Sequence, residues 1–319
     1  ETGEGSITTN IGAVRNTGIE LGLNLSVIRN KNFTWDVNLA FARNWSKITE
    51  LPNGDDVSSN WFIGERLNVL RDYTSAGIIT TDGITMRTKD GSRHYTLQEV
   101  YDTFGPGGQG LKWYEGQMAV NDWNNDGKID DEDKQIFGCT DPKWTGSLSS
   151  TMTYKGFDFS FMLYTKQGQW SRSYFHEQYM NYGDRGRQKM NFDYYIPAGT
   201  PVLDKNTGDV TYLSEAHIGK YPYPNNTEKT GGGYFSSSSA AVRYHKTSFV
   251  KVKNITLGYT FPKAWMSKIA VKHLRLYVNV INPFCFTDYE GFDPEWASAN
   301  LTNGGPASVT YQIGANIKF

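Results

Sequence analysis

The sequence predicts an all-β protein, a segment of an antiparallel transmembrane β-barrel with long extracellular loops. Apolar and polar residues alternate strictly over several stretches, and the connections between these stretches are short and long in turn. Aromatic residues are abundant, with 20 Tyr, 17 Phe and 9 Trp in 319 residues. A soluble β domain can share the alternation and the aromatic content, so the connection lengths decide between the two folds.

Alternation with a period of two places one class of side chain on each face of a strand. In IELGLNLSV, which starts at Ile19, every second residue is aliphatic and the residues between are Glu, Gly, Asn and Ser. The pattern recurs at 33–41, 157–163, 249–261, 274–280 and 309–319. A seventh stretch, 144–154, is weaker because Gly146 and Ser150 fall on its apolar face.

The apolar face of such strands meets either a second sheet, as in a sandwich, or lipid, as in an outer-membrane barrel. Strands of about 10 to 12 residues can cross a bilayer at a tilt and are roughly twice as long as usual soluble strands. The opposite face is rich in Gly, Ser, Thr and Asn, which suits a hydrated lumen. Aromatic residues cluster at the strand ends, where interfacial girdles lie: Phe33, Trp35, Tyr154, Phe157, Tyr259, Phe261 and Phe319. These features favour contact of the apolar face with lipid over packing on a second sheet.

The connections alternate in length along the chain. The turn RNKN, the turn at Lys155–Gly156 and the segment 262–271 are short, whereas 45–143, 167–248 and 283–307 are long. Outer-membrane barrels have short periplasmic turns and long extracellular loops, but a sandwich has no reason to keep its long loops on one side. We therefore expect all three long loops outside the cell. The first can contain another strand pair, with GIITTDGITM (77–86) as the candidate.

Composition restricts the class of protein further. Lys and Arg total 32 against 33 Asp and Glu, which argues against nucleic acid as a partner. The mean hydropathy of −0.55 and the lack of a long apolar run exclude a transmembrane helix but leave a membrane barrel open. The N-terminus has no signal-peptide pattern, as expected of a cytoplasmic chain or of a piece of a longer one. Seven to nine strands cannot close a wide barrel, so we expect an N-terminal remainder of the same protein to complete it.

The segment DWNNDGKIDDED has the spacing of a calcium-binding loop, with glycine at position 6 and a carboxylate at position 12. The expected ligands are the side chains of Asp122, Asn124, Asp126, Asp130 and Asp133 and the backbone carbonyl of Lys128. Gly127 permits the positive φ that the sharp turn requires. Asp133 departs from the usual Glu, and no amphipathic helix precedes the loop. The alternative is a solvated Asp/Asn turn that needs no ion.

Catalytic arrangements are not found, and we expect the protein not to be an enzyme. The five His show no ligand spacing, and no GxSxG elbow is present. Glu290, Asp293 and Glu295 could be imagined as a glycosidase pair, but their clustering in EGFDPEW is typical of an ordinary turn.

Two further features leave alternatives open. The aromatic loops 173–183 and 220–226 either stack on sugar rings or peptides, or pack within the loops. Cys139 and Cys285 have no metal-ligand spacing and could form a disulfide in an oxidising compartment.

Several of these motifs occur in the order in which SusC/RagA-like TonB-dependent transporters carry them, and the chain resembles the C-terminal part of that family's barrel. Such proteins show a DxNxDGxID string, then Gly and Pro, an aromatic residue with Thr-Gly, and a YKxFDxS hairpin. The counterparts are Asp122 to Asp130, Gly138, Pro142, Trp144 to Gly146 and Tyr154 to Ser160. NTGIELGLN (16–24), SFVKVKNITLGYTFP (248–262), GFDPE (291–295) and the terminal Phe319 are also similar. Cys139 departs from the small polar residue usual there.

The resemblance implies a 22-stranded, multi-pass barrel in the bacterial outer membrane. All of residues 1–319 would belong to it, and the plug and TonB-box region would be absent from this chain. The implied partners are TonB, acting through the missing part, a SusD-like surface lipoprotein, and an oligosaccharide or oligopeptide substrate. The alternative function is a secreted, calcium-stabilised β-sandwich or propeller that binds carbohydrate.

Overall fold

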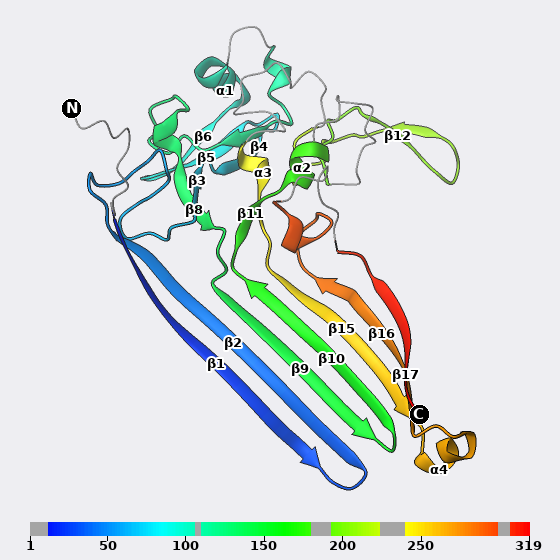
Figure 1. Ribbon diagram of the computed structural model, residues 1–319. Helices are drawn as coiled ribbons and strands as arrows, with labels where there is room; N and C mark the ends of the chain where they lie inside the picture. The colour runs from blue at the N-terminus through cyan, green and yellow to red at the C-terminus, as the bar shows by residue number, and fades with distance from the viewer. Residues whose placement is uncertain (1–11, 106–109, 180–192, 224–239, 299–306) are drawn as a thin grey trace, which may run out of the picture.

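The computed structural model describes residues 12–105, 110–179, 193–223, 240–298 and 307–319. Its largest element is a seven-stranded antiparallel sheet with the order β1-β2-β9-β10-β15-β16-β17 (Figure 1). The strands are β1 (Ala13–Arg29), β2 (Phe33–Glu50), β9 (Trp144–Tyr154), β10 (Phe157–Gln167), β15 (Phe249–Thr260), β16 (His273–Phe286) and β17 (Thr310–Lys318). The predicted strands are confirmed, including the weak one at 144–154. We call this sheet the wall.

One face of the wall carries rows of aliphatic and aromatic side chains that no second layer covers in the described residues. Phe159, Leu257, Val278 and Ile313 oppose one another in successive strands, so they share one face. The exposed fraction is 51% for Leu257 and 87% for Ile313. A sandwich would bury such a row, whereas a wall that faces lipid requires it to point outward.

The two small residues that weaken the pattern of β9 lie against aromatic side chains, one from β2 and one from β9 itself. The indole Nε1 of Trp35 donates a hydrogen bond to Ser150 Oγ at 3.0 Å. The rings of Phe41 and Trp144 lie 5.8 Å apart, and a Cβ on Gly146 would lie 3.3 Å from the Trp144 ring. Small residues at these two positions leave space for the rings, so β9 fits into the sheet although its own alternation is weak.

The short connections gather at one end of the wall and the long ones at the other (Figure 1). Lys155 (φ 46°) and Gly156 (φ 94°) form a two-residue turn with both central residues left-handed, as the twist of a tight hairpin demands. The turn between β15 and β16 contains only α4 (Lys263–Met266) and η4 (Ser267–Ile269). The described helices include none with the length and apolarity to span a membrane.

At the other end, the long connections fold into small elements that we call the loop layer. Its first part contains β3 (Val69–Asp72), β4 (Ser75–Ile78), β5 (Ile84–Thr88), β6 (Gly91–Tyr95), α1 (Leu97–Phe104), η1 (Leu111–Trp113), β7 (Met118–Val120), η2 (Asp131–Asp133) and β8 (Gln135–Cys139). The rest contains β11 (Trp170–Arg172), α2 (Tyr174–Tyr179), β12 (Pro201–Leu203), β13 (Val210–Tyr212), α3 (Ala240–Arg243), β14 (Tyr244–Lys246) and η5 (Pro294–Trp296).

The loop layer contains buried hydrophobic clusters. The first comprises Ile79, Ile84, Met86, Tyr95, Val100, Tyr114 and Ala119. The second comprises Ile78 and Met118 of the first loop and Tyr194, Tyr195, Tyr221 and Val242 of the second. Two long loops thus share one core, so they form a folded layer.

Two details of the first loop differ from the sequence prediction. β2 continues to Glu50, so the wall extends past residue 45. The segment 77–86 does not form a single strand pair. Gly77 and Ile78 end β4, which pairs with β7, and Ile84 begins β5, which pairs with β6. Between them, Thr80 and Gly83 form a single antiparallel bridge. The positive φ of Gly83 (100°) turns the chain between the halves, and each half finds another partner.

Candidate functional site

The polar face of the wall carries hydrogen bonds that run from strand to strand. Thr256 Oγ1 donates to Asn279 Oδ1 at 2.9 Å, and Asn279 Nδ2 donates to Gln312 Oε1 at 3.0 Å. The hydroxyls of Thr34 and Thr153 lie 2.6 Å apart. Polar side chains that satisfy one another and remain accessible suit a surface that faces water.

Near the end with short turns, this face carries an ion pair above a glycine. Arg275 Nε donates to Asp158 Oδ1 at 2.9 Å, and the Nη2 group donates to the second carboxylate oxygen. A Cβ on Gly258, which lies between them, would come within 2.5 Å of both Arg275 Nη2 and Asp158 Oδ1. Glycine is therefore needed for the two charged groups to meet across β15.

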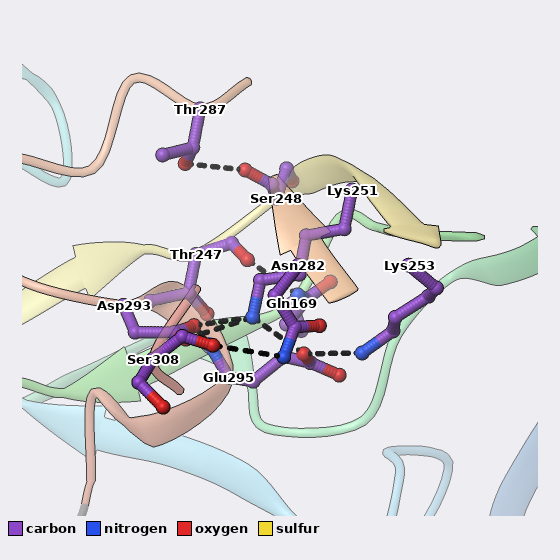
Figure 2. A network of polar contacts seen from close by, with 10 residues as sticks. All are labelled: Gln169, Thr247, Ser248, Lys251, Lys253, Asn282, Thr287, Asp293, Glu295 and Ser308. Carbon is purple, nitrogen blue, oxygen red and sulfur yellow. Dashed lines mark hydrogen bonds and ion pairs between the residues drawn. The ribbon is translucent and has the colours of Figure 1, made fainter. Parts of the chain in front are cut away.

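At the opposite end, two lysines and two carboxylates form what we call the lysine–carboxylate cluster (Figure 2). Lys251 Nζ lies 2.7 Å from Asp293 Oδ1 and 2.6 Å from Glu295 Oε2, and Lys253 Nζ lies 2.7 Å from the same Glu295 oxygen. The Lys251 side chain is 3% exposed. A charge this buried is tolerated only when it is paired. The cluster therefore fastens η5, in the third long loop, to the outer end of β15.

A β-bulge places both lysines together. Met162 opposes Asn254 but Leu163 opposes Val252, so Lys253 is an extra residue relative to β10. Lys251 opposes Tyr164, and Lys253 Nζ lies 5.3 Å from the centre of the Tyr164 ring. This cluster was not predicted, although two lysines close together at the start of the strand and the acidic EGFDPEW turn were both visible in the sequence.

The three carboxylates considered for catalysis have structural partners. Burial raises the pKa of Glu295, but the ammonium groups of Lys251 and Lys253 outweigh this effect and hold the pKa below its usual value. Glu290 accepts hydrogen bonds from Lys220 Nζ, at 3.0 Å, and from the Tyr221 hydroxyl.

The described parts of the aromatic loops predicted at 173–183 and 220–226 meet in a buried polar group, where the Tyr221 hydroxyl lies 3.3 Å from His176 Nε2. The rings of His176 and His245 stack with centres 3.7 Å apart. Ser173 Oγ lies 2.6 Å from His176 Nδ1 and 2.6 Å from the Tyr289 hydroxyl. Burial lowers the pKa of His176 to about 3, so the ring is neutral. These side chains pack within the loops; residues 180–183 and 224–226 lie outside the described part.

The predicted calcium loop follows β7, curls around its own side chains and ends in η2. Asp122 Oδ1 accepts the N–H of Asp126 at 3.2 Å, and Oδ2 accepts the N–H of Gly127 at 3.0 Å and the Tyr95 hydroxyl at 3.2 Å. Gly127 has φ 81°, as expected. Asp126 Oδ1 accepts the N–H of Lys128 at 2.9 Å.

Asp133 closes the loop. Its Oδ1 accepts the N–H of Trp123 at 2.6 Å, and its Oδ2 accepts the N–H of Asp130 at 2.9 Å. Asp122 and Asp133 are both 0% exposed, and burial raises the pKa of Asp133. No group of three or more His, Cys, Asp or Glu in the described residues is arranged to hold a metal ion. The predicted ligand set also contains the Asn124 amide and a backbone carbonyl, and the calcium site stays a prediction.

The two cysteines do not pair in this structure. Cys139 is free and buried at the end of β8, and Cys285 is free and exposed in β16. The Cys139 thiol lies 3.7 Å from Asp141 Oδ2.

Comparison with known proteins gives relatives that match this chain from end to end. No family model matches it. A TonB-dependent receptor of Formosa agariphila is 28% identical over 348 residues, which cover 100% of this chain and 32% of that protein. The TonB-dependent receptor SusC of Bacteroides thetaiotaomicron is 29% identical over 315 residues, 98% of this chain and 27% of that protein. The chain thus spans less than a third of these relatives.

Solved structures give the same fold. The RagAB peptide transporter matches with a TM-score of 0.60 and 20% identity, over 97% of this chain and 30% of that chain. The RagAB peptide importer in its open-open state matches with a TM-score of 0.60 and 21% identity, over 97% and 29%. The resemblance to SusC/RagA-like TonB-dependent transporters is confirmed, and so is the fold of a barrel segment, which is not closed in the described residues.

Proposed function

We propose that this chain, as a relative of TonB-dependent transporters, forms part of the wall and mouth of a bacterial outer-membrane importer. The imported substrate is an oligosaccharide or an oligopeptide, and a SusD-like surface lipoprotein acts with the transporter. TonB supplies the energy through a part of the protein outside this chain. The observation that carries the proposal is the uncovered apolar face of the wall, whose strands are long enough to cross a bilayer.

The alternative, a secreted β-sandwich or propeller, is disfavoured by the same face. A soluble β domain buries its apolar rows under a second layer. In the described residues the small sheets of the loop layer leave the row through Leu257 and Ile313 exposed.

Uptake by the full-length protein in its own outer membrane tests the proposal. Cells that carry it should take up labelled oligomers of one class, oligosaccharide or oligopeptide, and lose this uptake when a protonophore or a TonB deletion removes the energy supply. The protein should require detergent for extraction and migrate differently on gels before and after heating. Uptake that survives the protonophore, or a protein that stays soluble without detergent, would contradict the proposal.

We also propose that the loop 122–133 binds calcium and braces the first long loop. Asp122, Asn124, Asp126, Asp130, Asp133 and the Lys128 carbonyl would hold the ion. When bound, it would supply positive charge beside two fully buried carboxylates that form no ion pair in the described residues.

Calcium titration of the full-length protein tests this site. Calcium should raise the melting temperature, and the shift should disappear in Asp126→Ala. The matched control is Asp131→Ala, because Asp131 lies in the same loop but pairs with Lys134 at 2.6 Å and is not an expected ligand. A melting curve that is the same with calcium and with a chelator would refute the site.

A further inference from the structure

A pocket of about 390 Å³ opens in the loop layer at the outer end of the wall. It is lined by Tyr73, Thr74, Ser75, Arg87, Phe137, Trp170 and Tyr244. Phe137 belongs to β8, which leads into β9; Trp170 belongs to β11, which follows β10; Tyr244 belongs to β14, which leads into β15. The pocket therefore lies where three wall strands enter the loop layer, at the mouth of the proposed importer.

Aromatic rings hold the shape of this pocket. Phe137 packs edge-on against Trp170, with ring centres 5.5 Å apart, and against Tyr244, with ring centres 5.2 Å apart. A Cβ on Gly138 would lie 2.7 Å from the Trp170 ring, so glycine is needed beside it. The Tyr244 hydroxyl donates to Asp72 Oδ2 at 3.1 Å, which fixes the tilt of its ring. Interlocked rings of this kind form a rigid apolar surface before any ligand arrives.

Cationic groups surround the rings. Arg87 is exposed at the pocket, and in the described residues its guanidinium has neither a hydrogen bond nor an ion pair. Lys246 Nζ lies 5.6 Å from the centre of the Trp170 ring and has no carboxylate partner within the same part of the chain. Asp72 is the acidic group in contact with the lining, and it already accepts the Tyr244 hydroxyl.

The surrounding charges also act on Tyr244. Burial and the Asp72 carboxylate raise the pKa of its hydroxyl to about 12, while the positive charges of Arg243 and Arg172 act in the opposite direction.

We propose that this pocket binds an acidic sugar unit, a uronate or a sulfate ester, of the imported substrate. This inference rests on the proposed function and narrows its substrate class to acidic oligosaccharides. The apolar C–H face of the sugar would pack on the rings of Trp170 and Tyr244, and its anionic group would pair with the Arg87 guanidinium. The lining residues carry four aromatic rings, two aliphatic hydroxyls and a guanidinium. These groups suit a hydroxylated, charged ring, which packs its C–H face on aromatic rings and pairs its anionic group with a cation.

Calorimetric binding to the purified full-length transporter tests the proposal with four probes. These are tetragalacturonate, a sulfated galactan tetrasaccharide, the methyl ester of tetragalacturonate, and an acidic peptide. At least one acidic oligosaccharide should bind. The methyl ester keeps the rings and hydroxyls but lacks the charge, so it should bind at least about tenfold more weakly than tetragalacturonate if the uronate is the ligand.

Variants locate the site. Arg87→Gln should weaken binding of the acidic oligosaccharide by about tenfold to a hundredfold, because a charge-assisted hydrogen bond is lost. Lys89→Gln is the matched control. It removes one positive charge just beyond the end of the same strand, from an exposed side chain outside the lining, and should leave binding unchanged.

Three results would overturn the proposal: no binding of either acidic oligosaccharide, equal binding by Arg87→Gln and the unaltered protein, or binding of the acidic peptide alone. These results are separable from failure of the proposed function. If energy-dependent uptake of some oligomer persists while acidic sugars do not bind, only the pocket assignment fails. If no oligomer is taken up, the importer itself is refuted.

Discussion

The wall and the loop layer are stabilised in opposite ways. In the wall, each strand pairs with its sheet neighbours through a regular backbone ladder, and the apolar side chains point outward, with Leu21 57% exposed. In the loop layer, apolar side chains point inward, and Met86, Val100 and Tyr195 are fully buried. Contacts there join distant segments: the Tyr195 hydroxyl donates to Glu115, 80 residues earlier, at 2.6 Å.

Under the proposed function the difference follows from two solvents, lipid around the wall and water around the loop layer. Lipid accepts apolar side chains, so a wall in the membrane needs hydrogen-bonded backbone and no interior core. Contact between apolar side chains and water is unfavourable, so the loops must bury apolar area to fold stably. The lysine–carboxylate cluster belongs to both regions, since Lys251 lies in a wall strand and Asp293 in a loop.

Breaking the connection between the regions should have the largest effect. In Lys251→Met, Asp293 loses its buried cation, and the third long loop should lose about 3–5 kcal/mol of protection against local opening. Hydrogen exchange of residues 290–296 measures this loss. Lys253→Met is the control, because that side chain is 29% exposed and should cost much less. Equal exchange in the two variants would contradict the role given to Lys251.

A charge on the lipid-facing side of the wall should lower the free energy of unfolding strongly. The same charge at the next residue, which points to the polar face, should not. Leu23→Arg should destabilise the protein by about 2–4 kcal/mol, because the guanidinium would enter the hydrocarbon region. Asn24→Arg points to the other face and should change the free energy of unfolding little. Denaturant unfolding of the full-length protein in lipid vesicles compares them, and similar losses would show that the faces are wrongly assigned.

Acid should loosen the loop layer before the wall. The pKa of His176 is lowered by burial from 6.5 to about 3, so the unfolded loop binds a proton more tightly than the folded one. The stability that this neutral ring contributes is complete above about pH 6.5. It falls by roughly 1.4 kcal/mol for each pH unit below that value. Burial lowers the pKa of His245 as well, which adds in the same direction.

Hydrogen exchange of residues 173–176 between about pH 7 and about pH 5, corrected for intrinsic rates, measures this opening. His176→Gln should flatten the pH dependence. The gel mobility of the unheated protein should not change over this range. His245 should leave a weaker pH dependence in this variant. A pH dependence as steep as that of the unaltered protein would show that His176 does not cause it.

The smallest effect is expected at an accessible ion pair of the wall. Arg29 Nη2 lies 3.6 Å from Asp36 Oδ1, and the two side chains are 71% and 38% exposed. Asp36→Asn should therefore cost less than about 1 kcal/mol. Unfolding in denaturant provides the measurement, and a loss several times larger would mean that water does not reach this face.

The contrast between the wall and the loop layer also explains which parts of the structure the sequence could predict. Alternation is a local signal, so the wall strands were predictable even at β9, where Ser150 and Gly146 obscure it. The bulge at Lys253 was not, because an extra residue becomes visible only against the partner strand. In the loop 122–133 the sequence predicted the left-handed Gly127. It did not predict that Asp133 would close the loop by accepting the N–H groups of Trp123 and Asp130.

The loop layer was the least predictable part. Its buried clusters join Ile78 and Met118 to Tyr194 and Tyr221, and no periodicity links segments so far apart. The segment 77–86 shows the same limit. Its two halves resemble a hairpin but share one bridge, Thr80 with Gly83, and the strands at its two ends pair with β7 and β6.

The gathering of every long connection at one end of the wall has a consequence for how such a protein can diverge. Segments at that end can lengthen, shorten or be exchanged without altering strand register or the outward apolar rows, because the short connections at the other end hold the hairpins together. A lineage could thus change its imported substrate by replacing segments of the loop layer while the strands of the wall stay the same.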